Sequence, residues 1–142
     1  MQSAPNSSRT IYALSTASGK AGVAVVRVSG PEARAVLERM CPPLPAPRRV
    51  AFRTIRHPAT CAILDQAVVL FFAAESSETG EDVAELQLHG SRAVVRAVLE
   101  ALAAIPGLRL AEPGEFARRA FENGRIDLAA AEGLADLIDA ET

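Results

Sequence analysis

The run Ala67-Val68-Val69-Leu70-Phe71-Phe72 constrains the fold more than any other segment of the chain. Successive side chains of a strand point to opposite faces, so a strand with this sequence is apolar on both faces. That pattern is typical of a central strand, and we predict a strand over 67–73 inside a sheet. The valine-rich segment 22–28 predicts a second buried strand.

The remaining apolar patterns predict further strands and helices, which do not alternate strictly along the chain. We expect further strands at 10–14, 50–56, 60–64, 83–88 and 108–111. Apolar residues at helical spacing predict helices over 31–40 and 91–104, with Ser29 or Gly30 capping the first and Ser91 the second. Several strands separate successive helices, so we predict an α+β domain with a mixed sheet and helices packed on it.

The last third of the chain predicts a helix, a tight turn and a second helix. Pro113 suits a helix entry because its φ is already near helical, and Asn123-Gly124 is a strong stop signal. Asp127 stands where the N-cap of the next helix belongs. Arg125 projects from the turn between them. One apolar face of the first helix is formed by Phe116, Ala120 and Phe121.

Length and charge exclude several classes of protein. The 142 residues favour one domain, and the net charge of −2 argues against broad nucleic-acid binding by this chain. Arg48, Arg49, Arg53 and Arg56 form a basic run, for which a solvated loop and strand edge is favoured over an RNA-facing patch. We expect residues 1–9 to be disordered rather than a secretory signal, and no apolar run is long enough to span a membrane.

The cysteines indicate neither a disulfide framework nor a metal site. Cys41 and Cys61 are isolated, and with His57 and His89 they make no metal signature. Reduced thiols in a cytosolic protein are the simplest interpretation. We predict no metal ligand and no catalytic residue.

Two arginines have both a structural and a functional interpretation. Arg27 shares one strand face with Val23 and Val25. It can pair with a neighbouring acid or bind a ligand carboxylate or carbonyl through two parallel hydrogen bonds. Arg125 can pair with Glu122 in a weak surface interaction, or it can contact a ligand.

Three segments together resemble the N-terminal folate-binding domain of the tRNA modification GTPase family MnmE, also called TrmE. They are 22–31, 79–90 and 113–139, and the resemblance extends from about residue 10 to the last residue. It implies that Arg27, Glu85 and Arg125 contact a tetrahydrofolate derivative, 5-formyl- or 5,10-methylene-tetrahydrofolate. The pterin ring presents an amino group beside a ring N–H, which the two oxygens of Glu85 match. Without the resemblance, Glu85 fits an ordinary half-solvated strand.

The chain departs from the family pattern at a few positions. The family often has lysine where Arg125 stands and glutamine where Ala130 stands. The loop 76–78 replaces a more aromatic version. The changes at Ala130 and in the loop remove no residue expected to contact the folate. Arginine at position 125 keeps the charge of lysine but changes the geometry of its donors, so we expect a different affinity.

The resemblance also implies an organisation and a set of partners. We expect 10–122 to be a folate-binding and dimerisation domain like that of glycine-cleavage aminomethyltransferase, and 123–142 to begin a truncated helical domain. The GTPase domain, with its GTP, Mg²⁺ and K⁺, is absent, so we expect the chain to be inactive alone. We expect a bacterial, cytoplasmic protein. The resemblance implies that the full-length protein is a homodimer that modifies the wobble uridine of tRNA at carbon 5 with a flavoprotein, MnmG.

Two other functions stay open at this point. The chain could be a purely structural dimerisation domain that binds no folate in isolation. It could also be an independent folate-dependent methyltransferase, which its short length disfavours.

Overall fold

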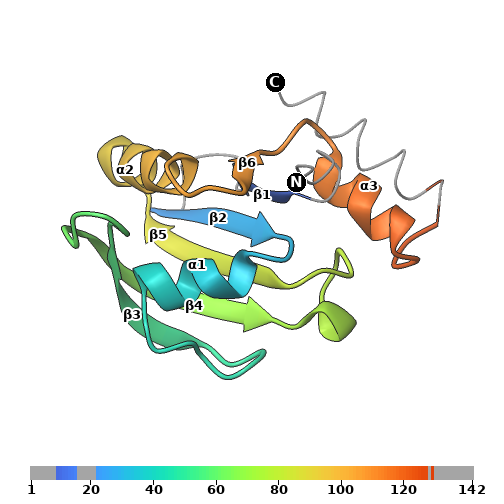
Figure 1. Cartoon of the computed structure of the whole chain (residues 1–142), viewed down its shortest axis with the longest axis horizontal. Helices are drawn as coiled ribbons and strands as arrows, with labels where there is room; N and C mark the ends of the chain where they lie inside the picture. The colour runs from blue at the N-terminus through green and yellow to red at the C-terminus, as the bar shows by residue number, and fades with distance from the viewer. Residues whose placement is uncertain (1–8, 16–21, 128, 130–142) are drawn as a thin grey trace, which may run out of the picture.

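The computed structural model describes residues 9–15, 22–127 and 129 of the chain (Figure 1). Its elements, in chain order, are β1 (Thr10–Leu14), β2 (Val23–Ser29), α1 (Ala33–Met40), β3 (Ala51–Arg56), β4 (Ile63–Phe72), the 3-10 helix η2 (Ala74–Ser76), β5 (Val83–His89), α2 (Arg92–Ala103), β6 (Leu108–Leu110) and α3 (Glu115–Glu122). The predicted disorder over 1–9 and the predicted helix after Asp127 lie outside the described residues, apart from residues 9 and 129.

The strands form one six-stranded sheet in the order β3-β4-β5-β2-β1-β6. β1 and β6 are parallel, whereas the other neighbouring strands are antiparallel. The predicted α+β fold with a mixed sheet is therefore confirmed, and β4 is an interior strand as expected. Of the helices, α1 and α2 pack on the sheet. α3 lies beyond the end of the sheet to which the arrowhead of β2 points (Figure 1).

One face of the sheet carries the main hydrophobic core. The buried side chains come from alternate positions of the strands and from one stripe of each of α1 and α2. They include Val26, Val28, Val69, Phe71, Leu86, Leu88, Leu37, Met40, Val98 and Leu102. Because strand side chains alternate, the residues between these positions on β2 and β5 point to the other face of the sheet. That second face carries the polar residues of interest.

The capping prediction for α1 was wrong. Ser29 belongs to β2, and Gly30 lies against the backbone of Thr10, so neither caps the helix. The helix begins at Ala33 with Glu32 at the N-cap position. Thr10 Oγ1 accepts a hydrogen bond from the N–H of Glu32 at 2.8 Å, so a residue of β1 satisfies this helix entry. Ser91, by contrast, caps α2 as predicted, accepting a hydrogen bond from the N–H of Val94.

The two strands predicted over 60–64 and 67–73 are one continuous strand, β4. The polar pair Asp65-Gln66 does not interrupt it. The Asp65 carboxylate accepts hydrogen bonds from the backbone N–H of His89 and contacts its ring, so it pairs with the end of β5. A register shift between Ile55 and Arg56 accommodates the turn that precedes β4.

α3 ends where the sequence predicts and begins slightly later. Its C-cap is Asn123, and Gly124 adopts φ 71°. The helix starts at Glu115, after Gly114 in a left-handed conformation. The prediction that Phe121 belongs to the apolar face of this helix was wrong, because its side chain is 40% exposed. The buried face of α3 is instead partly charged, and its buried residues are Glu115, Ala117, Arg119 and Ala120.

Candidate functional site

Arg27 and Glu85 lie opposite each other on the second face of the sheet. Arg27 of β2 and Glu85 of β5 are direct partners in the antiparallel ladder. Arg27 Nη2 is 3.5 Å from Glu85 Oε1, and both side chains are partly buried. The structural interpretation of Arg27, in which it pairs with a neighbouring acid, is therefore confirmed. The same pair also presents a donor and an acceptor side by side.

Gln87 holds the Glu85 carboxylate from the other side. Its Nε2 donates a hydrogen bond of 3.0 Å to Glu85 Oε2, two residues along the same face of β5. An ionised carboxylate has about four acceptor sites, and these two contacts leave room for further donors. Glu85 is thus an oriented acceptor that is not saturated.

Arg125 reaches the same end of the sheet from the turn after α3. Its Nη2 donates a hydrogen bond of 2.7 Å to the carbonyl of Ala74. The predicted alternative, a pairing with Glu122, is not what the structure shows, because Glu122 faces Arg118. Arg125 does not contact Glu85 directly, but it shares a hollow with Arg27.

Two adjoining hollows connect the three predicted residues. The first, which we call the Glu85 hollow, has a volume of about 190 Å³. The second, the Arg125 hollow, has a volume of about 420 Å³. The Glu85 hollow is lined by Arg27, Arg48, Phe72, Ser76, Glu78, Thr79, Val83 and Glu85. The Arg125 hollow is lined by Arg27, Glu78, Thr79, Phe116, Ala117, Ala120, Arg125 and Ile126. Arg27, Glu78 and Thr79 line both.

A buried ionic network fixes the wall formed by α3. Glu115, whose side chain is fully buried, accepts hydrogen bonds from both terminal nitrogens of Arg109 and one from Arg119. Arg119, only 3% exposed, also donates to both oxygens of Glu81. Burial acts to raise the pKa of Glu115. The hydrogen bonds from Arg109 and the Glu112 N–H, with the charges of Arg109 and Arg119, outweigh it and lower the pKa to about 2.

The loop before β5 is tied to the same wall through side-chain hydroxyls and an amide. Ser29 bonds both Thr79 and Glu81, and Asn123 Nδ2 donates to the carbonyl of Thr79 at 2.9 Å. Gly80 packs so closely on Asn123 that a Cβ atom there would lie 2.5 Å from the Asn123 Cβ. The loop and the turn that carries Arg125 are therefore held at a fixed separation.

Sequence reasoning missed several of these residues. Glu81 stands in the polar segment before a predicted strand, and Glu115 and Arg119 have the i,i+4 spacing that surface pairs on helices also have. Gln87 is two residues from Glu85 and therefore on the same face of the strand. This spacing is the one sequence signal that could have identified Gln87 as a site residue. No local sequence pattern identifies Glu78, since its position at the hollows depends on where the loop before β5 lies.

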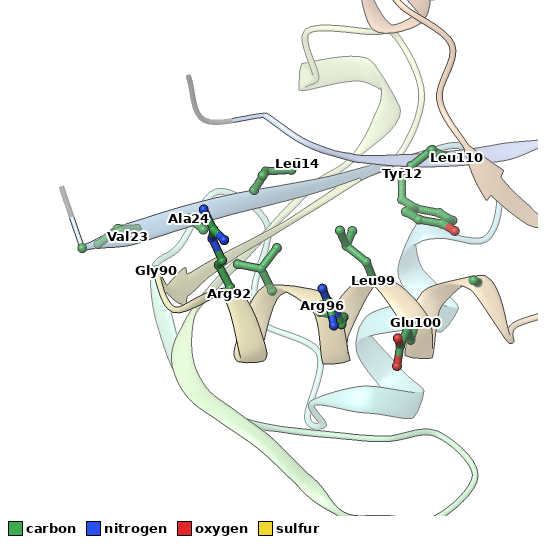
Figure 2. A pocket seen from close by; sticks show the side chains of 13 residues that line it. Tyr12, Leu14, Val23, Ala24, Gly90, Arg92, Arg96, Leu99, Glu100 and Leu110 are labelled. Atoms are coloured by element: carbon green, nitrogen blue, oxygen red, sulfur yellow. The ribbon is translucent and has the colours of Figure 1, made fainter. Parts of the chain in front are cut away.

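A larger hollow lies apart from these residues, between α2 and the strands β1, β2 and β6 (Figure 2). Its volume is about 640 Å³ and its lining is largely apolar, including the exposed side chains of Leu14, Val23 and Leu110. Arg96 and Glu100 flank it from α2 (Figure 2). None of the three predicted site residues lines it.

Comparison with known proteins identifies the family. The family described as "GTP-binding protein TrmE N-terminus" matches residues 10–125. The chain belongs to this family. The resemblance seen in the three sequence segments is thereby confirmed.

Curated relatives agree with this assignment. The chain is 59% identical over 134 residues to the "tRNA modification GTPase MnmE" of Parvibaculum lavamentivorans, covering 94% of the chain and 31% of that protein. It is 54% identical over 133 residues to the "5-taurinomethyluridine-[tRNA] synthase subunit GTPB3, mitochondrial" of Danio rerio, covering 94% of the chain and 27% of that protein. The chain thus spans less than a third of the length of these relatives.

The described residues form neither a membrane-spanning helix nor a metal-binding cluster. Over the residues the structure describes, no helix is long and apolar enough to cross a membrane. In the same part of the chain, no group of three or more His, Cys, Asp or Glu side chains could hold a metal ion.

Proposed function

We propose that this chain is the folate-binding and homodimerisation module of a tRNA modification GTPase. The observation that carries the proposal is the placement of Arg27, Glu85 and Arg125 around two adjoining hollows. These residues come from strands and a turn that are far apart in the chain. Together the hollows fall within the range of about 300–1,000 Å³ typical of small-molecule sites.

The chemistry of the two hollows fits the two ends of a folate. In the Glu85 hollow, the carboxylate can accept hydrogen bonds from the paired donors of a pterin ring. The Arg125 hollow offers Phe116 and two alanines to an aromatic ring, and a guanidinium to an acidic tail. We propose 5-formyl- or 5,10-methylene-tetrahydrofolate as the ligand.

The test is calorimetric titration of the 142-residue protein with 5-formyltetrahydrofolate. A Glu85→Gln variant replaces one acceptor oxygen with a donor that opposes the pterin donors. We expect at least a tenfold weaker Kd, because a hydrogen bond to a charged group contributes about 1.5–3 kcal/mol. Glu38→Gln is the matched control, since Glu38 is exposed on α1, away from both hollows. Equal affinity of Glu85→Gln and the unmodified protein would refute the role of Glu85.

Homodimerisation is the second part of the proposal. The apolar hollow of Figure 2 supports it, because exposed Leu14, Val23 and Leu110 surround one concave surface. Contiguous exposed apolar surface is typical of protein interfaces. Light scattering should give twice the mass of the chain at micromolar concentration. A dimer that binds no folate would favour the purely structural alternative.

The activity of the whole protein is proposed from the family alone. Its relatives are named as tRNA modification enzymes, and we propose that the intact protein modifies tRNA in the cytoplasm with an MnmG-type flavoprotein. GTP hydrolysis would belong to a separate GTPase domain. We further propose that the folate domain spans 10–122 and that a helical domain begins at 123, near the end of the family match at residue 125.

A further inference from the structure

The carboxylate of Glu78 lies at the junction of the two hollows. Glu78 lines both of them, together with Arg27 and Thr79. Its Oε2 is 3.5 Å from Arg27 Nη1, while its side chain is 85% exposed. The contact therefore lies across the path that an elongated ligand would take between the Glu85 hollow and the Arg125 hollow.

Arg27 is held between two carboxylates in different ways. Nη2 faces Glu85, which Gln87 fixes in place within the sheet. Nη1 faces Glu78, which projects from the loop before β5. A guanidinium donates from a rigid planar fork, so the two edges of Arg27 cannot turn independently. A ligand can therefore reach Arg27 only at Nη1, once the carboxylate of Glu78 has moved away from this nitrogen.

The backbone on both sides of Glu78 is anchored. Ser77 and Thr79 are buried, and the hydroxyl of Ser77 donates to the carbonyl of Glu81 and accepts from the N–H of Gly80. The hydroxyl of Thr79 bonds that of Ser29 in the neighbouring strand. The side chain of Glu78, by contrast, is largely exposed, so it can rotate away from Arg27 without any change in the loop backbone.

We propose that Glu78 is a specificity-determining residue that competes with the ligand for the donor at Arg27 Nη1. The ligand displaces it by bringing its own carboxylate or carbonyl oxygen to that nitrogen. This inference rests on the proposed function, since it concerns the same site. A ligand without an acceptor at this point gains nothing from displacing Glu78, which selects for ligands that carry one.

The displacement is expected to be easy. Ion pairs with an exposed partner contribute little to stability, because the exposed group is well solvated when the pair is broken. Removing the Glu78 side chain should therefore tighten ligand binding by roughly two- to fivefold rather than by orders of magnitude. If Glu78 itself bound the ligand, removing its side chain would instead weaken ligand binding.

The experiment compares Glu78→Ala with Glu38→Ala in the 142-residue protein. Both substitutions remove one exposed negative charge, so the net charge of the protein changes equally in the two variants. With 5-formyltetrahydrofolate as the probe, calorimetry should show a two- to fivefold lower Kd for Glu78→Ala and no change for Glu38→Ala. An unchanged or higher Kd for Glu78→Ala overturns the inference while the proposed function stands.

A second measurement needs no folate and separates the two proposals. Phenylglyoxal modifies accessible guanidinium groups, and mass spectrometry can locate the adduct at Arg27. If none of the proteins binds folate, the proposed function fails, and the rate at Arg27 decides the role of Glu78. A faster reaction in Glu78→Ala than in Glu38→Ala supports the shielding of Arg27, and equal rates refute it.

Discussion

Glu115→Gln tests whether the buried network behind the site is held by charge. Glu115 is fully buried and accepts hydrogen bonds from the guanidinium groups of Arg109 and Arg119. Glutamine keeps the shape and one acceptor oxygen but removes the negative charge. The two guanidinium groups then lose their shared counter-ion in a site with little access to water.

The magnitude follows from the pKa of Glu115. Its pKa is lowered from 4.5 to about 2, and each pKa unit corresponds to about 1.4 kcal/mol. The ionised carboxylate therefore contributes about 3 kcal/mol to the free energy of unfolding at pH 7. This matches the lower end of the 3–5 kcal/mol expected when one partner of a buried pair is removed. For a chain of this length it corresponds to roughly 10 °C in Tm.

Urea unfolding at two pH values separates charge from packing. Because the folded-state pKa is depressed, the stabilisation by Glu115 is fully present above about pH 4.5 and is lost as the pH falls towards 2. At pH 3 only about 1.4 kcal/mol of it remains. The difference in free energy of unfolding between the unmodified protein and Glu115→Gln should thus shrink by about 2 kcal/mol from pH 7 to pH 3.

A difference that stays constant between pH 7 and pH 3 would refute this reasoning, since it would show that Gln disturbs packing rather than charge. Glu112→Gln is the matched control. Glu112 lies in the same segment, but its side chain is 67% exposed and its nearest cation, Arg118, is 3.9 Å away. We expect the control to change the free energy of unfolding by less than about 0.5 kcal/mol at either pH.

Two further predictions concern the loop and the thiols. Gly80→Ala should lower the free energy of unfolding by about 2–3 kcal/mol in urea unfolding, because its positive φ and its close approach to Asn123 both oppose a side chain. Gly124→Ala, with positive φ but open space around it, should lose only about 1 kcal/mol, and equal losses would contradict the steric argument. An Ellman assay of the native protein should detect the exposed Cys61 alone, because burial raises the pKa of Cys41 to about 12. Rapid reaction of both thiols without denaturant would contradict that burial.

Much of the sheet could be predicted because strand periodicity is local. Alternation alone shows that Arg27 shares a strand face with Val23 and Val25, and that Glu85 shares one with Gln87, and it needs no tertiary information. It cannot say that β2 and β5 are neighbours or that these two residues are in register. That pairing depends on how the whole sheet assembles, so the salt bridge between them is visible only in the structure.

The errors have a common physical cause. Asp65-Gln66 has the composition of a turn, and Ser29-Gly30 that of a helix cap, yet both are overridden by contacts with distant segments. Likewise, Glu115 and Arg119 have the spacing of a surface pair and become buried because β6 and the loop before β5 enclose them. Local sequence describes what a segment can do, and tertiary packing selects among those possibilities.

The bond between Arg125 and the carbonyl of Ala74 joins parts of the chain that are made at different times. Synthesis on the ribosome proceeds from the N-terminus, so β2, β5 and the loop between β4 and β5 emerge well before the turn that carries Arg125. A nascent chain can therefore pair Arg27 with Glu85 while the second wall of the site is still absent. Ligand capture would be a late event in biogenesis, and a chain halted before this turn would present a sheet without a closed site.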